Sequence, residues 1–275
     1  MRRKTMKNIL TAPFIQEISE ITANMYRLGW DERNGGNISW LLEDEPLEYY
    51  LDLDHVIRTI PINFDASYVA GRIFMVTGTG KYFKNITPNP AENLGIVRVA
   101  QDGKSLELLW GFEGNAAPTS EFPTHLMNHM ERLKVDPTHR VIMHCHPVNT
   151  IAMTFVHSID EKEFTKTLWG MCTECIVVFP DGVGIVPWMI AGTNKIGELT
   201  AEKIRDRRII LWAQHGIFAA GHTLDEAFGL IETVEKAAEI YMKIAPLPIV
   251  NKIPEEQLGE LARSFGVTPR EGYLD

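Results

Sequence analysis

Residues 141–150 read VIMHCHPVNT, an apolar run that ends in two histidines and leads into a segment with helical spacing. We expect a strand over 141–146 and a helix over 147–156. Because alternate side chains of a strand point to the same face of its sheet, His144 and His146 share one face while Cys145 points to the other. Two imidazoles placed in this way suit a zinc ion, but an ordinary strand can also end in two histidines. Other parts of the chain must distinguish these interpretations.

The composition is that of an ordinary folded protein. Of the 275 residues, 45% are hydrophobic and 23% are charged, which is typical of a soluble globular chain. A chain of this size buries a substantial core without disulfides or a structural metal, so a bound metal would serve chemistry. No segment has the composition of a linker, and we expect a single domain over residues 1–275.

The formal net charge is −9, with acidic residues spread along the chain. This charge argues against nucleic acid as a partner, although a local pocket can still hold a small phosphorylated substrate. The N-terminal stretch MRRKTMKNILTAPF starts with basic residues like a signal peptide, but its short apolar part is interrupted by Pro13, Gln16 and Glu17. With no run approaching the length of a membrane span, we expect a cytoplasmic protein without a membrane partner.

Strands and helices alternate irregularly along the chain, with hairpins among them. This mixture favours a mixed or largely antiparallel sheet covered by helices. We expect an irregular excursion at the sheet edge over 43–67, and caps from Gly29, Thr119 or Ser120, Thr193 and Thr223. The expected strands are 38–42, 72–78, 95–100, 105–111, 141–146, two within 175–188, and 209–216. The expected helices are 13–29, 119–133, 147–156, 196–204, 224–244 and 254–266.

The three cysteines are Cys145, Cys172 and Cys175. The last two have C-x-x-C spacing, which occurs in zinc ribbons and in redox motifs. A zinc ribbon needs a second such pair, and a thioredoxin-like motif opens a helix, whereas the run IVVF that follows here is expected to form a strand. We therefore expect two packed or partly exposed thiols.

A catalytic metal site needs a third protein ligand. His215, in AQHG, is expected at the end of a strand, where Gly216 lets the chain turn away. His125 and His129 share one face of the expected helix, a spacing that also suits a metal. They lack the interior glutamate of the H-E-x-x-H motif. The alternative is that they are packed or surface histidines. Glu121 lies in the first turn of the same expected helix. Its carboxylate would bind the ion or act as a base, or it simply completes the helix N-terminus.

Two glycine-rich turns, RNGGNIS at 33–39 and TGTGK at 77–81, offer backbone N–H groups and polar side chains to an anion. The second turn is neither a P-loop nor a dinucleotide fingerprint, because Met75 and Phe83 stand at the required glycine positions. The residues thus indicate a metalloenzyme acting on a small phosphorylated compound. The alternative is a metal-free binding or scaffold module of the same fold.

The same segments together resemble the class II aldolase and adducin family. The resemblance extends from about residue 13 to residue 269. The motifs that carry it, in chain order, are GWDERNGGNIS (29–39), FMVTGTGKYF (74–83), NLGIVRV (93–99), PTSEFPTH (118–125), RVIMHCHPVN (140–149), LWGMCTECIVVFPDGVGIVPWM (168–189), WAQHG (212–216) and LDEAFGLIETVEKAA (224–238).

The resemblance implies a three-layer α/β/α sandwich around a mostly antiparallel central sheet. It also implies a homotetramer with active sites between neighbouring subunits. One zinc ion per subunit would be bound by His144, His146 and His215. The glutamate that matches Glu121 ligates the resting metal in that family and then acts as the base.

The resemblance assigns further roles to polar residues. Glu174 matches a glutamate that reaches the active site of a neighbouring subunit and serves the proton on the aldehyde side; alternatively, it is a surface glutamate. Thr79 replaces a serine that is common in the family and keeps its hydroxyl. The residues expected around the substrate phosphate are Asn34, Gly36, Asn37, Thr79 and Ser120.

The activity implied by the resemblance is that of a zinc-dependent aldehyde-lyase. The sequence around Glu121 and over 169–188 is most similar to family members that cleave L-rhamnulose 1-phosphate, in L-rhamnose breakdown, to dihydroxyacetone phosphate and L-lactaldehyde. One alternative is an aldolase for another ketose 1-phosphate, such as L-fuculose 1-phosphate. The other is a non-enzymatic, adducin-like module.

Overall fold

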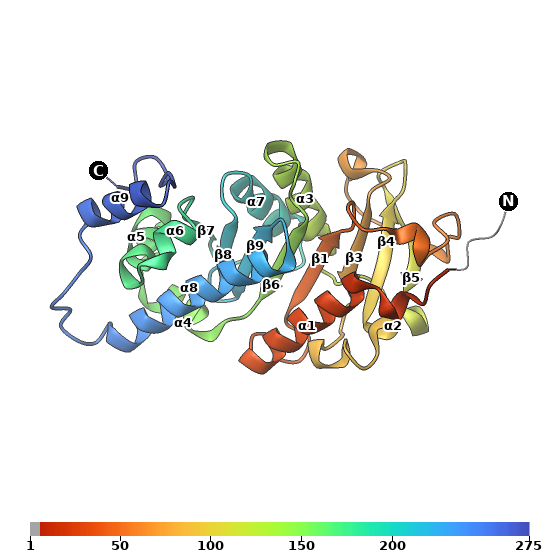
Figure 1. The fold of residues 1–275 in the computed structure, drawn as a ribbon, viewed down its shortest axis with the longest axis horizontal. Coiled ribbons are helices and arrows are strands. Elements are labelled where there is room, and N and C mark those ends of the chain that lie inside the picture. The colour runs from red at the N-terminus through yellow and green to blue at the C-terminus, as the bar shows by residue number, and fades with distance from the viewer. Residues whose placement is uncertain (1–5, 275) are drawn as a thin grey trace.

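The computed structural model describes residues 6–274, so the first five residues of the basic N-terminal stretch lie outside the described residues. Within 6–274 the strands form one nine-stranded sheet in the order β2-β5-β4-β3-β1-β6-β9-β8-β7 (Figure 1). Only β7 and β8 run parallel, so the expectation of a largely antiparallel sheet is confirmed. The strands are β1 (Asn37–Leu41), β2 (Arg58–Pro61), β3 (Ile73–Thr77), β4 (Leu94–Val99), β5 (Ser105–Gly111), β6 (Val141–Cys145), β7 (Val183–Val186), β8 (Ile209–Trp212) and β9 (Gly216–Gly221).

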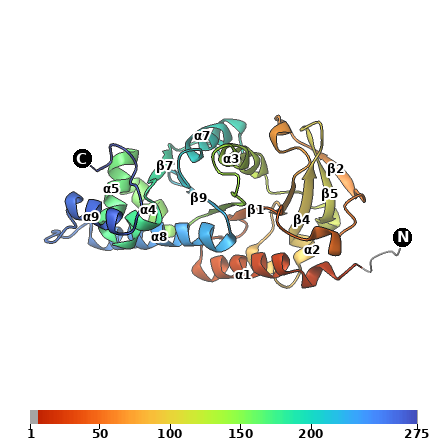
Figure 2. The same ribbon diagram turned by 45° about the horizontal axis from the view of Figure 1, so that its top comes forward.

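Helices cover both faces of this sheet, which confirms the three-layer α/β/α arrangement. Figure 2 shows α3 and α7 on one side of the sheet and α1 and α8 on the other. The α-helices are α1 (Pro13–Leu28), α2 (Pro90–Asn93), α3 (Phe122–Val135), α4 (Val148–Val156), α5 (Glu161–Met171), α6 (Glu174–Val178), α7 (Asn194–Ile204), α8 (Leu224–Ile244) and α9 (Glu255–Ser264). Short 3₁₀ turns lie at Ile9–Thr11, Leu47–Tyr49, Ser67–Val69, Phe83–Asn85 and Glu113–Asn115.

The alternation along β6 separates the two halves of the core. Val141, Met143 and Cys145 join the larger cluster, beneath α1 and α8, whereas Ile142 joins the cluster beneath α7. Cys145 therefore points away from the face that carries His144, as the strand periodicity predicts.

Most of the expected helix ends are confirmed. Gly29 ends α1 in the left-handed conformation with φ of 74°. The Thr193 and Thr223 hydroxyls accept the N–H groups of Ile196 and Glu226, respectively. The expected cap of α3 is wrong: Glu121 is the N-cap, and its carboxylate makes no capping bond because it is engaged elsewhere, as described below.

Three expectations for the secondary structure are wrong in detail. Residues 174–178 form helix α6 rather than a strand, because this short apolar run packs against α5, α8 and α9. Strand β8 ends at Trp212, and the chain turns back before Gly216, which starts the unexpected strand β9. The segment 43–67 lies at the sheet edge as expected, but it is not wholly irregular, because it contributes β2, one of the two edge strands.

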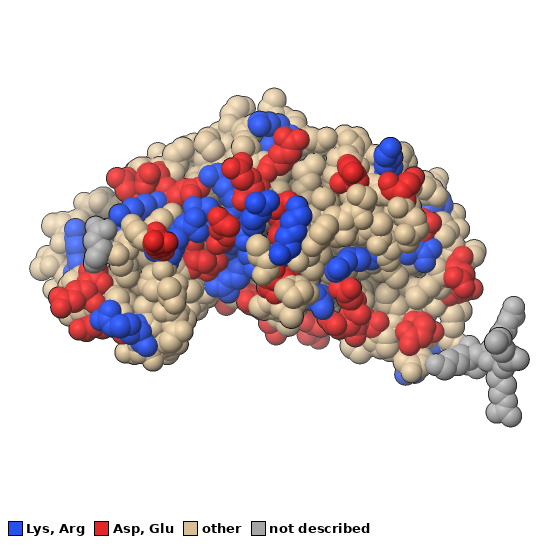
Figure 3. Space-filling model, turned by 90° about the horizontal axis from the view of Figure 1, so that it is seen from above, with Lys and Arg blue, Asp and Glu red and all other residues tan. Residues whose placement is uncertain are grey.

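Among residues 6–274, no helix is long and apolar enough to cross a membrane. On the face shown in Figure 3, basic and acidic side chains are interspersed. Among the described residues, ion pairs join Glu131 with Lys134 and Arg205, and Glu161 with Lys203 and Arg207.

Candidate active site

Three histidines from two separate parts of the chain converge at one end of the central strands. His144 is on β6, His146 follows that strand, and His215 lies in the turn between β8 and β9. One ring nitrogen from each lies within 4.8 Å of the others. The Nε2 atoms of His144 and His146 are 3.2 Å apart. The structure therefore brings together the three residues that the resemblance names as metal ligands.

Two local features make this convergence possible. A Cβ added at Gly216 would lie 2.5 Å from the Cys145 carbonyl oxygen and 2.9 Å from the His144 ring, so only glycine fits there. Gln214, at φ of 59°, is held in the left-handed conformation by bonds from its backbone and side-chain N–H groups to Thr154 of α4. This turn directs His215 back toward β6.

Two of the histidine rings, those of His144 and His146, are oriented by hydrogen bonds on their other nitrogens. His144 Nδ1 donates to the Ile217 carbonyl oxygen at 2.9 Å. His146 Nδ1 donates to the Glu32 carboxylate at 2.9 and 3.1 Å. These bonds place the protons on Nδ1 and leave Nε2 with a free lone pair, the arrangement of metal-bound histidines.

Burial keeps the imidazoles of His144 and His215 unprotonated. It holds the pKa of His144 well below its ordinary value, and the neighbouring His146 and His215 depress it further. Burial, again with a contribution from His146, lowers the pKa of His215 to about 4. Neutral imidazole is the form that binds a metal, so near neutral pH these two residues are ready to do so.

The donor set fits a divalent transition metal. For zinc–nitrogen bonds of about 2.0–2.1 Å, two ligands of a tetrahedron lie about 3.3–3.4 Å apart. The observed 3.2 Å between the nitrogens of His144 and His146 is close to this value. Three imidazoles, two of them with rings oriented by hydrogen bonds, suit zinc and related ions and would leave a further coordination position open.

Glu121 lies beside the triad, at the start of α3. Its Oε2 is 3.6 Å from His144 Nε2 and accepts a hydrogen bond of 2.9 Å from Asn37 Nδ2. Burial raises the pKa of Glu121, while the bond from Asn37 and the nearby His146 oppose this rise. A raised carboxyl pKa is a property of general acids and bases.

The residues expected around a phosphate fall into two groups. Asn34, Thr79 and Ser120 are exposed and Gly36 is buried. The loop after β3 is joined to the segment before α3 by the bond from Thr79 N–H to the Ala117 carbonyl, so the segments of Thr79 and Ser120 lie side by side. The Asn37 side chain bonds to Glu121 and His125 instead, so it is already engaged within the protein.

Glu174 lies on α6, an element that carries none of the three histidines. It is exposed on α6, which packs against α5, α8 and α9, and its carboxylate accepts a hydrogen bond from Cys172 Sγ. Cys172 is partly exposed and Cys175 is buried, as expected for two packed or partly exposed thiols. The segment after this pair forms helix α6 and not the expected strand. The expected strand was the argument against a thioredoxin-like redox motif, so that argument no longer holds.

His125 and His129 are fully buried in α3 and hydrogen-bond to protein groups, which is the packed alternative. The sequence reasoning missed Glu32, which orients His146. No spacing signal joins two residues that are 114 positions apart. The one available signal was chemical: a metal-ligating histidine usually has a carboxylate or carbonyl partner, and GWDERNGG supplies two acids.

Comparisons with known proteins identify the family of this chain. Residues 16–242 match the family model described as Class II Aldolase and Adducin N-terminal domain. A rhamnulose-1-phosphate aldolase of Listeria monocytogenes is 54% identical over 98% of this chain and 99% of the relative. One of Enterococcus faecalis is 56% identical over 98% of this chain and 96% of the relative.

The fold is similar to that of solved structures as well. The crystal structure of a sugar-phosphate aldolase from Thermotoga maritima matches with a TM-score of 0.74 and 29% identity, over 86% of this chain and 97% of that one. The expected family and fold are both confirmed. The chain belongs to the class II aldolase and adducin family.

Proposed function

We propose that the protein is a zinc-dependent aldolase that cleaves L-rhamnulose 1-phosphate to dihydroxyacetone phosphate and L-lactaldehyde. The observation that carries this proposal is the match to rhamnulose-1-phosphate aldolases at 54–56% identity over nearly the whole chain. The convergence of three histidines and a buried glutamate supports it independently, because these are the groups that the chemistry requires.

In this proposal His144, His146 and His215 hold the zinc ion. When bound there, zinc supplies a Lewis acid that stabilises the negative charge developing when the carbon–carbon bond breaks. Ile217 and Glu32 keep the His144 and His146 rings in orientation through the bonds to their Nδ1 atoms. The protein thus provides the site in a preorganised form.

Glu121 is the proposed proton carrier. During cleavage the hydroxyl of the aldehyde half loses its proton, for which Glu174 of a neighbouring subunit is the proposed acceptor. Glu121 then gives a proton to the carbon of the dihydroxyacetone phosphate half, and in the direction of synthesis it removes that proton. Its buried position and raised pKa make proton uptake easier than for an exposed glutamate. The bond from Asn37 holds Oε2 and so defines where the carboxylate lies.

The turns around Asn34, Gly36, Thr79 and Ser120 are the proposed phosphate site. Their backbone N–H groups, hydroxyls and amide suit an anion. Asn37 belongs to the site in a different way: its side chain supports Glu121. A direct role of Asn37 toward phosphate would use its backbone.

We further propose that the active enzyme is a homotetramer in which Glu174 of one subunit completes the site of another. The exposure of Glu174 supports this arrangement, as do exposed apolar side chains such as Trp188 and Ile190, which are 67% and 70% exposed. The proposed unit is one class II aldolase domain over residues 1–275. The proposed compartment is the cytoplasm, where phosphorylated sugars are retained.

A substrate comparison tests the proposed function. The zinc-loaded protein is assayed with L-rhamnulose 1-phosphate and with L-fuculose 1-phosphate, and dihydroxyacetone phosphate is measured through coupled NADH oxidation. We expect kcat/KM to be higher for L-rhamnulose 1-phosphate. A higher value for L-fuculose 1-phosphate would assign the other substrate, and no release from either by metal-loaded protein would favour a non-enzymatic module.

A further inference from the structure

A chain of buried hydrogen bonds leads from Glu121 to the far end of α3. Asn37 Nδ2 bonds to Glu121, and Asn37 Oδ1 lies 2.5 Å from His125 Nε2. His125 Nδ1 is 2.8 Å from Ser39 Oγ. The same hydroxyl is 2.8 Å from His129 Nε2, and His129 Nδ1 is 2.9 Å from His139 Nε2.

These groups leave little room for charge. Ser39, His125 and His129 are fully buried and His139 is 1% exposed. Burial lowers the pKa of His125 and of His139 to about 3, and burial together with both neighbouring histidines holds the pKa of His129 well below its ordinary value. Each imidazole is therefore neutral near pH 7, with one donor and one acceptor nitrogen.

The direction of every bond then follows from Glu121. A carboxylate only accepts, so Asn37 turns its NH₂ group toward Glu121 and its oxygen toward His125. That oxygen also only accepts, so the proton of His125 is on Nε2 and its Nδ1 accepts from the Ser39 hydroxyl. Ser39 must then accept from His129 Nε2, whose Nδ1 accepts from His139 Nε2.

We propose that Ser39, His125, His129 and His139 are positioning residues that hold the Asn37 amide in the orientation required to donate to Glu121. This proposal rests on the function proposed for Glu121. Five hydrogen bonds point the same way and polarise one another, so each strengthens the donation to the carboxylate. Without them the Asn37 amide is free to turn its oxygen toward Glu121, where two acceptors would repel each other.

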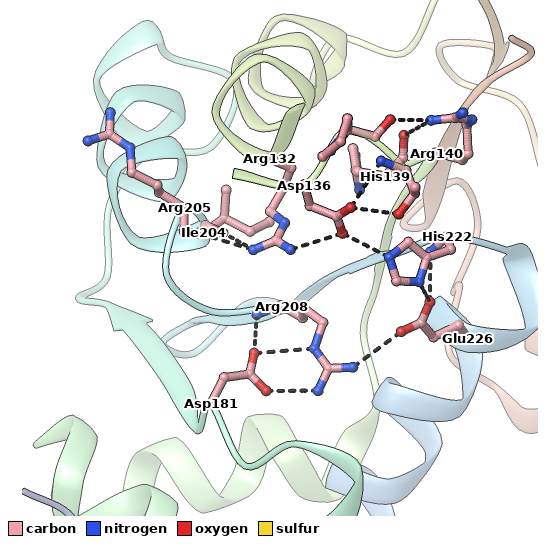
Figure 4. Close-up of polar contacts among 12 residues, drawn as sticks. Arg132, Asp136, His139, Arg140, Asp181, Ile204, Arg205, Arg208, His222 and Glu226 are labelled. Atoms are coloured by element: carbon pink, nitrogen blue, oxygen red, sulfur yellow. Dashed lines mark hydrogen bonds and ion pairs between the residues drawn. The ribbon is translucent and has the colours of Figure 1, made fainter. Parts of the chain in front are cut away.

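The series of hydrogen bonds ends at His139, which lies in a network of charged residues. Figure 4 shows His139 beside Asp136 and Arg140, with Arg132 and His222 also bonded to Asp136. This network anchors the loop that carries His139, since Asp136 also accepts from the backbone and hydroxyl of Thr138. The series of hydrogen bonds therefore ends at a loop that several hydrogen bonds and ion pairs hold in place.

The test interrupts the series of hydrogen bonds at its middle with one small substitution. Ser39→Ala deletes one hydroxyl and leaves both histidine rings, while Ser19→Ala deletes another buried hydroxyl, which bonds to a helix carbonyl of α1, and serves as the control. The readout is exchange of the C3 protons of dihydroxyacetone phosphate with D₂O, which requires Glu121 but not the sugar aldehyde. Metal content and thermal stability are measured on the same samples.

We expect Ser39→Ala to lower the maximal exchange rate about 10- to 100-fold, with the concentration dependence and zinc content unchanged. Ser19→Ala is expected to exchange at the wild-type rate. Equal rates for Ser39→Ala and wild type would overturn the positioning role while leaving the proposed function intact.

A conservative pair separates positioning from packing. His129→Gln keeps an N–H group for Ser39, whereas His129→Leu fills similar space without one. We expect the glutamine variant to retain most of the exchange rate that the leucine variant loses. Equal losses in the two variants would mean that only packing matters at this position.

If the wild-type protein shows no exchange, the proposed role of Glu121 is contradicted. The directions of the hydrogen bonds are then tested separately, by neutron diffraction of the deuterated protein. Deuterium on Nε2 of His125, His129 and His139 is the expected result. Deuterium on Nδ1 of any of these three residues would contradict the bond directions.

Discussion

Glu121 Oε2 lies 3.6 Å from His144 Nε2, which joins a buried carboxylate at the start of α3 to a metal-ligand candidate on β6. The two residues are brought together by the sheet, since β1, which carries Asn37, pairs with β6 at His144. The groups proposed for proton transfer and for metal binding therefore lie next to each other. This proximity is the structural basis of the proposed aldolase chemistry.

The carboxylate of Glu32 is expected to strengthen metal binding through His146. Glu32→Gln keeps a hydrogen-bond acceptor but removes the negative charge that makes the imidazole a better ligand. We expect zinc affinity to fall about tenfold or more, measured by competition with a chromogenic chelator. The control is Glu239→Gln, at a residue that pairs with Lys243 on the outer side of α8 and is expected to leave affinity unchanged. Equal affinities for Glu32→Gln and wild type would contradict this role.

Gly216→Ala is expected to disrupt the metal site more than the fold. The added Cβ would approach the Cys145 carbonyl and the His144 and His146 rings, so at least one ligand must move. We expect less than one zinc per subunit after dialysis, measured by elemental analysis. Gly229→Ala, on α8 with open space around it, is the matched control and is expected to keep full zinc content and gain up to about 1 kcal/mol of stability. Full zinc content in both variants would show that the turn adapts.

Glu235 is expected to stabilise the segment that follows His146. Its carboxylate accepts bonds from the backbone N–H groups of Asn149 and Thr150 at 3.0 and 2.8 Å, and from both of their side chains. Glu235→Gln places an NH₂ group against these donors. We expect the free energy of unfolding to fall by about 2–3 kcal/mol in urea denaturation. A loss no larger than that of Glu239→Gln would show that water replaces these bonds.

His139 is expected to make stability depend on pH. Burial lowers its pKa to about 3 in the folded protein, against 6.5 as its ordinary value, so below pH 6.5 the unfolded chain binds a proton that the folded chain does not. Because the buried His139 stays neutral, the free energy of unfolding decreases progressively as the pH falls below 6.5. The stability penalty of His139→Gln should be about 2 kcal/mol smaller at pH 5 than at pH 7 in urea denaturation. The same penalty at both pH values would contradict the burial argument.

Much of the site was predictable because it depends on periodicity and local chemistry. Strand alternation placed His144 and Cys145 on opposite faces, and glycine spacing marked the turns. The helix at 174–178 was not predictable, because a short apolar run fits a strand or a buried helix equally well. The turn between β8 and β9 was expected at Gly216 but lies before it, since it uses Gln214 in a left-handed conformation that carries no glycine signal.

Contacts between distant segments were the least predictable part of the site. The pairing of Glu32 with His146, and of Ser39 with His125 and His129, depends on how β1 lies between β3 and β6. A single sequence contains the residue types for these bonds but not the strand order that joins them. The packed state of His125 and His129 was therefore only one of two alternatives.

The most direct test of the account measures dihydroxyacetone phosphate release from L-rhamnulose 1-phosphate before chelation, after thorough chelation, and after zinc is restored. The account predicts release that chelation abolishes and zinc recovers, and no recovery in a His144→Ala variant. Undiminished release from protein shown by elemental analysis to be free of metal would contradict it.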